Sequence, residues 1–145
     1  MRSAKNKNTV HLVFEKFFRS GLRMFLKILF RVRVEGEEYL QPSKDPTLIV
    51  CNHTSLLDGV MLYAFLPEAP LFLVNKTTAE VWYFKIFLCP IAKLLIDDLH
   101  PMTLKKAVKH LVAGDAIVVF PEGRITTTGV LMKIYDGPAM LAAKS

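Results

Sequence analysis

The fold is decided by the stretch Thr47-Leu48-Ile49-Val50-Cys51-Asn52-His53-Thr54-Ser55-Leu56-Leu57-Asp58. Residues 47–52 are rich in β-branched and apolar side chains, which is typical of a buried strand. Ser55 then begins a helical pattern that continues to about residue 66, just before a proline. His53 lies between the two elements, at the end of the strand, and ligands gather at such strand ends in open α/β sheets.

The same alternation of strands and helices continues along the chain. Strands are expected over residues 31–35, 47–52, 71–74 and 115–120, and helices over residues 10–30, 55–66, 79–95, 103–113 and 131–144. This order predicts an α/β fold with a mixed, largely parallel sheet flanked by helices, preceded by a basic amphipathic helix at the N-terminus.

Length and composition favour one folded domain. The chain has 145 residues, of which 52% are hydrophobic, and this argues against disorder. Its two cysteines, Cys51 and Cys89, form no disulfide framework, so a reducing compartment is expected. No apolar run reaches the roughly 18 to 20 residues that cross a bilayer, and no signal peptide is evident. The protein is therefore expected to be soluble or attached to one face of a membrane.

The basic residues are concentrated at the N-terminus. Residues 1–33 carry a net charge of +8, whereas the other 112 residues carry −2. Five basic side chains fall within an arc of about 120° on a helical wheel whose remaining surface is apolar. They are Lys16, Arg19, Arg23, Lys27 and Arg31. Such a helix suits the interface of an anionic membrane, and the alternative is a helix that packs on its own domain and keeps its charges in water. Because the rest of the chain is acidic, no nucleic-acid partner is expected.

His53 and Asp58 form the first candidate pair for catalysis. Five residues on a continuous helix separate two side chains by about 140°, so the pair can meet only if His53 stays in a loop before Ser55. Asp58 would then accept a hydrogen bond from one imidazole nitrogen and leave the other to take a substrate proton. A structural alternative stays open, because Ser55 and Asp58 also fit a capping box as N-cap and N3.

A second polar stretch follows the strand expected at residues 115–120. It runs Phe120-Pro121-Glu122-Gly123-Arg124-Ile125-Thr126-Thr127-Thr128-Gly129. Gly123 allows a ligand to approach the backbone, and Arg124 offers a planar fork suited to phosphate. Glu122 can orient Arg124 or bind a hydroxyl group, although a tight turn with a surface Glu-Arg pair would use the same residues. Because parallel strands end at one edge, both polar stretches are expected together, and a base beside an arginine indicates a phosphorylated alcohol as acceptor.

The remaining polar residues are assigned smaller roles. Three histidines lack a partner at a useful spacing and are expected on the surface: His11, His100 and His110. A nucleophilic pair of Cys51 and His53 is disfavoured, because the thiol should face the core. No third metal ligand lies near His53 in the sequence, so no metal site is expected.

Asn52, His53 and Asp58, followed by residues 120–123, resemble two sequence blocks of the glycerolipid acyltransferases of the lysophosphatidate acyltransferase type. The first block of that family is Asn-His-x-x-x-x-Asp, and its third is Phe-Pro-Glu-Gly followed by an arginine. The resemblance covers roughly residues 25–145. Residues 120–129, 131–137 and 142–145 are also similar to the acyltransferase portion of bifunctional 2-acylglycerophosphoethanolamine acyltransferases/acyl-[acyl-carrier-protein] synthetases.

The resemblance implies an enzyme in which His53, oriented by Asp58, deprotonates the free hydroxyl of a lysophospholipid. The alkoxide would attack the thioester of an acyl-carrier protein or acyl-CoA, without a cofactor or metal, at the cytoplasmic face of a membrane. The residues expected to bind substrate are Asn52, Ser55, Glu122, Gly123, Arg124, Thr126 and Lys133, the last of which can also be merely solvated. Acceptors on this interpretation are lysophosphatidylethanolamine or lysophosphatidate.

The sequence departs from the family pattern in three places. Arg124 follows Gly123 directly, whereas most members have a threonine between them. Asp97 and Asp98 stand where an arginine is expected, which favours a zwitterionic headgroup whose ammonium an acid can meet. The fourth block is missing, so residues 34–145 are expected to be only part of an acyltransferase domain. Residues 1–33, with their basic amphipathic helix, are expected to be a membrane-associating arm. Two rivals follow: a catalytically inactive membrane-binding fragment, and a thioester hydrolase in which His53 activates water.

Overall fold

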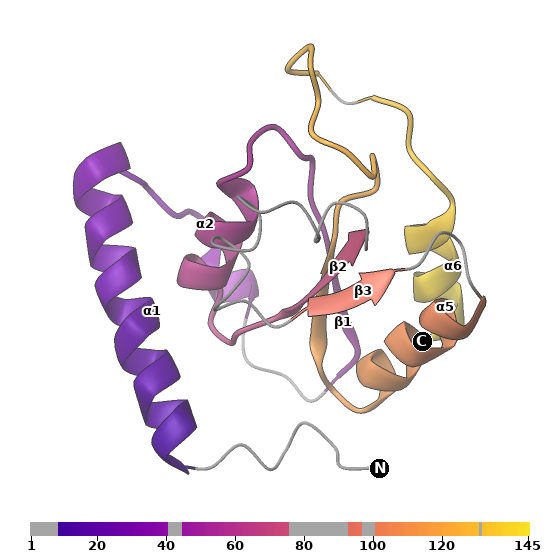
Figure 1. The fold of residues 1–145 in the computed structure, drawn as a ribbon, viewed down its shortest axis with the longest axis horizontal. Coiled ribbons are helices and arrows are strands. Elements are labelled where there is room, and N and C mark those ends of the chain that lie inside the picture. The colour runs from indigo at the N-terminus through magenta and orange to yellow at the C-terminus, as the bar shows by residue number, and fades with distance from the viewer. Residues whose placement is uncertain (1–8, 41–44, 76–92, 97–100, 131) are drawn as a thin grey trace.

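A small parallel sheet lies at the centre of the structure, which is a computed structural model (Figure 1). The structure describes residues 9–40, 45–75, 93–96, 101–130 and 132–145. Within this part of the chain the strands are β1 (Thr47–Val50), β2 (Leu71–Asn75), β3 (Lys93–Ile96) and β4 (Ala116–Val119). They lie in the order β1-β4-β2-β3, and every pair is parallel. The predicted α/β fold with a largely parallel sheet is therefore confirmed.

Helices cover both faces of this sheet. Helices α2 (Asp58–Phe65) and α1 (Thr9–Phe30) lie on one side, and α5 (Pro101–Val112) and α6 (Gly137–Lys144) lie on the other (Figure 1). A short 3₁₀ turn, η1, spans Glu37–Tyr39. The helices over residues 10–30 and 103–113 thus appear close to where the sequence places them.

Alternate residues of β4 pack against opposite helix layers. Val118 is fully buried in a cluster with Tyr63 and Leu66 of the α2 side. Ile117 is also fully buried, but packs with Leu111 and Leu141 of α5 and α6. This period of two, with apolar side chains on both faces, is what a strand in the middle of a covered parallel sheet requires.

The prediction of a strand over residues 31–35 is wrong. Arg31 ends α1 with a left-handed backbone conformation, φ 52°, and residues 32–35 belong to no strand or helix. Alternation of charged and apolar residues there resembles a strand, but a strand also needs a neighbour that pairs with it, and residues 32–35 pair with none of the described strands. Val32 instead packs against the cluster of Leu26, Ala64 and Phe65.

The expected helices over residues 79–95 and 131–144 also need correction. Lys93 to Leu95 lie in β3, where Lys93 is paired with Phe72 of β2, so no helix reaches residue 95. Residues 79–92 lie outside the described residues. Helix α6 begins only at Gly137, because a proline occupies its first turn and presets the start of a helix.

Candidate active site

The two polar stretches meet at one edge of the sheet. β1 and β4 are neighbours whose last residues, Val50 and Val119, are paired, and the Cys51 N–H donates to the Val119 carbonyl at 3.1 Å. The two segments that follow β1 and β4 therefore leave the sheet side by side. The expectation that a parallel sheet brings His53 to the residues after β4 is confirmed.

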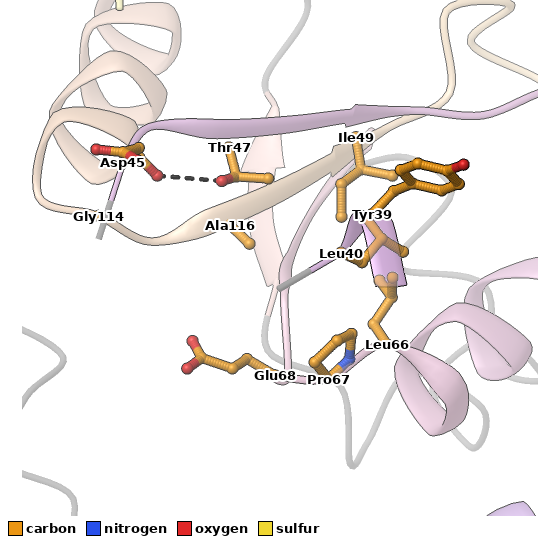
Figure 2. Close-up of a pocket in the computed structure, with 10 residues that line it drawn as sticks. All are labelled: Tyr39, Leu40, Asp45, Thr47, Ile49, Leu66, Pro67, Glu68, Gly114 and Ala116. Carbon is orange, nitrogen blue, oxygen red and sulfur yellow. Dashed lines mark hydrogen bonds between the residues drawn. The ribbon is translucent and has the colours of Figure 1, made fainter. Parts of the chain in front are cut away.

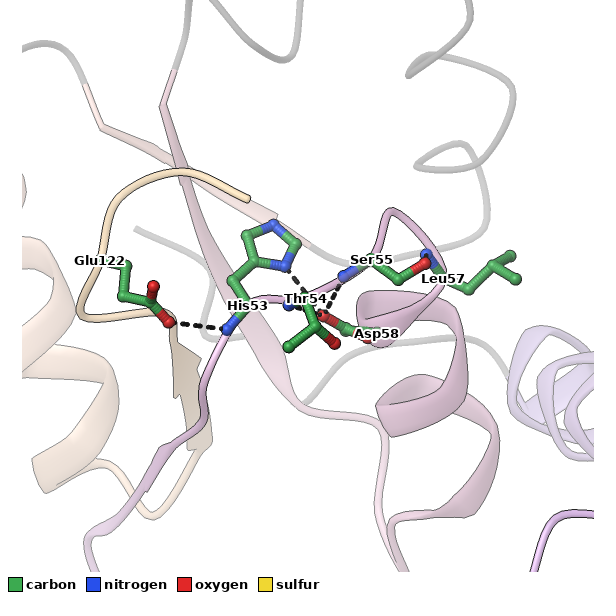
Figure 3. Close-up of polar contacts among 6 residues, drawn as sticks. All are labelled: His53, Thr54, Ser55, Leu57, Asp58 and Glu122. Atoms are coloured by element: carbon green, nitrogen blue, oxygen red, sulfur yellow. Dashed lines mark hydrogen bonds and ion pairs between the residues drawn. The ribbon is translucent and has the colours of Figure 1, made fainter. Parts of the chain in front are cut away.

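His53 and Asp58 form the expected pair. The imidazole Nδ1 lies 3.1 Å from Asp58 Oδ2, with the two side chains 17% and 23% exposed (Figure 3). His53 is in the loop, as the helical geometry demanded, and α2 begins only at Asp58 rather than at Ser55. A carboxylate only accepts hydrogen bonds, so this contact places the proton of a neutral ring on Nδ1 and leaves the Nε2 lone pair for a substrate.

The capping box needs correction, because Leu57 rather than Ser55 is the N-cap of α2 and Asp58 is its first residue rather than N3. The same oxygen, Oδ2, accepts from the backbone N–H groups of Thr54 at 2.7 Å and Ser55 at 2.8 Å. The Ser55 hydroxyl in turn accepts from the Leu57 N–H at 3.1 Å. One carboxylate thus stabilises the turn before α2 and orients the histidine ring.

Glu122 ties the second polar stretch to His53. It is only 2% exposed, its Oε1 accepts from the His53 N–H at 3.0 Å, and its Oε2 accepts from the Met132 N–H at 3.1 Å. Figure 3 shows this carboxylate on the backbone side of His53. Both oxygens are used inside the protein, so the structure gives Glu122 a positioning contact where the sequence indicated a substrate contact or an arginine partner.

Thr126 binds the backbone carbonyl of His53, as Glu122 binds its backbone N–H. Its N–H donates to the His53 carbonyl at 2.7 Å, and its hydroxyl donates to the Val130 carbonyl at 2.9 Å. Together with Glu122, it leaves neither backbone polar group of His53 unpaired. The loop after β4 therefore fixes the backbone of the proposed base, while Asp58 fixes its ring.

Phe120 is a site residue that the sequence analysis missed. Its ring stacks on the His53 imidazole with centroids 4.0 Å apart and an interplanar angle of 18°. A signal was available, because Phe120 lies two residues after Val118 and so faces the same side of the sheet. The stacking limits the imidazole to one plane.

Arg124 is the cation that the sequence places in the second polar stretch. Its side chain is exposed, and within the described part of the chain its guanidinium has no hydrogen-bond or ion-pair partner. The preceding turn favours a glycine, since Gly123 has φ 64°, a left-handed conformation that L side chains rarely adopt. Asn52 is also exposed, and the Lys133 ammonium lies over the Tyr135 ring at 5.5 Å from its centroid.

Cys51 does not have the properties of a nucleophile. Burial raises the pKa of its thiol, and the negative charge of Asp58 raises it further. A thiol with a raised pKa stays protonated at neutral pH, and the thiolate is the reactive form. Among the described residues no group of three or more His, Cys, Asp or Glu side chains could hold a metal ion.

His110 corrects another expectation. No partner was expected from its spacing, yet the His110 Nδ1 lies 2.7 Å from Asp115 Oδ2, with both side chains 34% exposed. The two residues flank Gly114, whose φ of 86° turns the chain from α5 into β4. This pair has the same five-residue separation as His53 and Asp58. It lies before β4, however, at the amino-terminal ends of the strands and not at the carboxyl-terminal ends where the candidate active site lies.

A hollow of about 240 Å³ also lies at the amino-terminal ends of β1 and β4. Thr47 and Ala116, which begin β1 and β4, line it together with Tyr39, Asp45 and Glu68 (Figure 2). Since ligands in parallel α/β sheets bind beyond the carboxyl ends of the strands, this hollow is separate from the His53 site. Asp97 and Asp98 lie outside the described residues.

The chain belongs to the Acyltransferase family, whose sequence model matches residues 31–145. It is similar to the 1-acyl-sn-glycerol-3-phosphate acyltransferase of Bacillus subtilis (strain 168), with 26% identity over 121 residues that cover 81% of this chain and 60% of the relative. The crystal structure of the 1-acyl-sn-glycerophosphate acyltransferase PlsC from Thermotoga maritima has the same fold. Its TM-score is 0.63 at 24% identity, over 90% of this chain and 54% of that one. The chain thus spans little more than half the length of these relatives.

Proposed function

We propose that this chain carries the catalytic base of an enzyme that transfers a fatty acyl group to the free hydroxyl of a lysophospholipid. One observation carries the proposal: Asp58 and the Phe120 ring fix the His53 imidazole, Glu122 fixes the His53 backbone, and Asp58 leaves Nε2 unused. Such a group can act as a general base, which contributes about 10²- to 10⁴-fold to a rate. Membership of the Acyltransferase family supports this choice of chemistry.

The reaction needs no residue to form a covalent intermediate. His53 Nε2 takes the proton of the acceptor hydroxyl as its oxygen attacks the carbonyl of an acyl thioester. The carbon–sulfur bond then breaks, and the thiolate leaves with the proton that the imidazolium holds. Acyl-carrier protein or coenzyme A is the proposed carrier, and no cofactor or metal is required.

Arg124 is the proposed anchor for the phosphate of the acceptor. Its guanidinium is exposed and lacks a protein partner in the described part of the chain, and a planar fork of donors suits phosphate oxygens. The name of the Bacillus subtilis relative supports lysophosphatidate as acceptor. Lysophosphatidylethanolamine remains the second acceptor proposed, on the acidic residues at 97 and 98.

The proposed location is the cytoplasmic face of a membrane, through α1. No helix among the described residues is long and apolar enough to cross a bilayer. Ten large apolar side chains of α1 are nevertheless exposed, among them Phe14 (69%), Phe17 (76%) and Ile28 (74%). An apolar surface of this kind marks an interaction site, and a helix lying in the lipid interface would bury it.

The direct test is an acyl-transfer assay on vesicles. Acyl-CoA and acyl-carrier protein are offered separately as donors, with lysophosphatidate or lysophosphatidylethanolamine as acceptor, and the products are identified by mass. Formation of diacyl phospholipid that depends on the acceptor supports the proposal. Release of free fatty acid at the same rate without any acceptor would establish the thioester hydrolase instead.

A further inference from the structure

The carboxyl end of α2 is held by two arginines from α1. A helix leaves its last four carbonyl groups without partners, and in α2 these belong to residues 63–66. Arg19 donates from Nε to the Tyr63 carbonyl at 2.8 Å and from Nη2 to the Leu66 carbonyl. Arg23 donates from Nε to the Ala64 carbonyl at 3.0 Å and from Nη2 to the Phe65 carbonyl at 3.3 Å. Each of the four carbonyls therefore accepts from a guanidinium.

Two residues of the basic stripe of α1, Arg19 and Arg23, therefore face the protein. Arg19 and Arg23 also lie over the rings of Tyr63 and Phe65, at 5.4 and 5.6 Å from the ring centroids. Burial lowers the pKa of Arg19, because its charge is partly withdrawn from water. Two positive charges at the negative end of the α2 dipole offset that cost.

Two kinds of contact attach α1 to α2: the guanidinium hydrogen bonds, and an apolar contact through Leu22 and Leu26. Among the α1 side chains whose burial is described, at residues 12–30, only Leu26 is buried, in a cluster with Ala64 and Phe65. A planar fork that bonds two carbonyls fixes both distance and rotation, which a lysine does not. Arg19 and Arg23 therefore orient the carboxyl end of α2 against α1, beside the apolar contact of Leu22 and Leu26.

The other end of α2 carries Asp58. The helix has eight residues, so about 12 Å of rigid backbone separate the arginine contacts from the carboxylate that orients His53. We infer that Arg19 and Arg23 are positioning residues: they couple the seating of α1 on lipid to the placement of Asp58, and through it to the tautomer of His53. This inference rests on the proposed function, in which α1 is the membrane helix and His53 the base.

The test compares two double variants of the chain that remove equal charge from α1. Arg19→Gln with Arg23→Gln removes the contacts to α2, whereas Lys16→Gln with Lys27→Gln removes two exposed charges from the same helix. Vesicles with about a third phosphatidylglycerol serve as the lipid, and sedimentation first establishes binding. Amide exchange across α2 and the ¹⁵N resonances of the His53 ring are then recorded with and without vesicles.

In the wild type, vesicles are expected to slow amide exchange in both α1 and α2 and to leave His53 as one tautomer, protonated on Nδ1. In the arginine variant, α1 still binds, but exchange at α2 becomes about tenfold faster and insensitive to vesicles, because four charge-assisted hydrogen bonds are lost. The His53 ring then samples both tautomers. Without vesicles, the lysine variant should match the wild type at α2 and at the ring.

Two results would overturn the inference. Faster exchange at α2 with an unchanged His53 tautomer would reduce the arginines to a purely structural role, and unchanged exchange in the arginine variant would remove even that role. Absence of vesicle binding by the wild type is a distinct failure, since it removes the membrane location and with it the coupling. If the glutamine variant does not fold, Arg19→Lys with Arg23→Lys keeps the charges without the forks, and should give intermediate exchange.

Discussion

Asp58 uses one oxygen for three contacts, with the His53 ring and with the N–H groups of Thr54 and Ser55. The loop before α2 therefore folds around the same atom that orients the base. Removing Asp58 would disturb the loop and the ring together, so its loss alone does not separate structure from catalysis. Glu122 and Cys51 allow cleaner tests.

Glu122→Gln keeps the shape of a buried side chain but replaces one acceptor by a donor. The amide nitrogen would face a backbone N–H, either that of His53 or that of Met132, and leave it unpaired. We expect the free energy of unfolding to fall by about 1–3 kcal/mol, as for other unsatisfied buried groups. Urea denaturation measures the loss, and turnover per folded molecule should fall too. Wild-type stability in this variant would show that the two contacts are unimportant.

Cys51→Ala tests the rival nucleophile. The raised pKa of the thiol keeps it protonated at neutral pH, so the residue has no chemical role in the proposed reaction. Acyl transfer by Cys51→Ala is expected within about twofold of the wild type, with native thiol alkylation slow for the same reason. A hundredfold loss of transfer in a folded variant would instead support a covalent thioester on Cys51.

At the scale of elements, α1 differs most from its prediction. The helical wheel correctly groups the basic side chains, but a wheel does not reveal which side of a helix meets the protein. That depends on the carbonyl end of α2, more than 40 residues away in the sequence, which accepts from Arg19 and Arg23. The membrane-facing surface proposed for α1 is consequently its apolar side, with Lys16 and Lys27 exposed.

Vesicle binding should follow that apolar side. Phe17→Gln with Ile28→Gln removes two side chains that are 76% and 74% exposed, so the fold loses little. Each apolar side chain contributes roughly 1.5–3 kcal/mol when buried, so the partition coefficient onto vesicles should fall at least about tenfold. The matched control is Met102→Gln with Val112→Gln, which changes two exposed apolar residues of α5. Equal losses in both variants would contradict a specific role for α1.

At the scale of the whole molecule, the sheet separates two packed layers. The His53 site lies beyond the ends of β1 and β4, whereas Ile117 faces α5 and α6. Ile117→Ala should lower the free energy of unfolding by about 2–5 kcal/mol, since Ile117 is fully buried. Turnover per folded molecule should stay unchanged when corrected by the denaturation curve. A loss of turnover without loss of stability would show that the layers are coupled.

The sequence predicted the site better than it predicted the elements around it. Local patterns and simple geometry predict a parallel sheet with His53 and Glu122 at the ends of its strands. They also predict the contact between His53 and Asp58. They do not predict pairing partners: residues 31–35 alternate but find no strand, and Lys93 joins β3 although its surroundings favour a helix. The Phe120 stacking and the Asp115 contact of His110 likewise depend on the three-dimensional arrangement of the chain.

The measurement closest to the central claim compares His53→Ala with His110→Ala. Both histidines contact an aspartate five residues later, at 3.1 and 2.7 Å, but only His53 lies at the site edge of the sheet. Acyl transfer to a lysophospholipid on vesicles should fall at least about a hundredfold in His53→Ala, the usual contribution of a general base. His110→Ala should transfer at the wild-type rate. Equal transfer by His53→Ala and the wild type would contradict the assignment of His53 as the base.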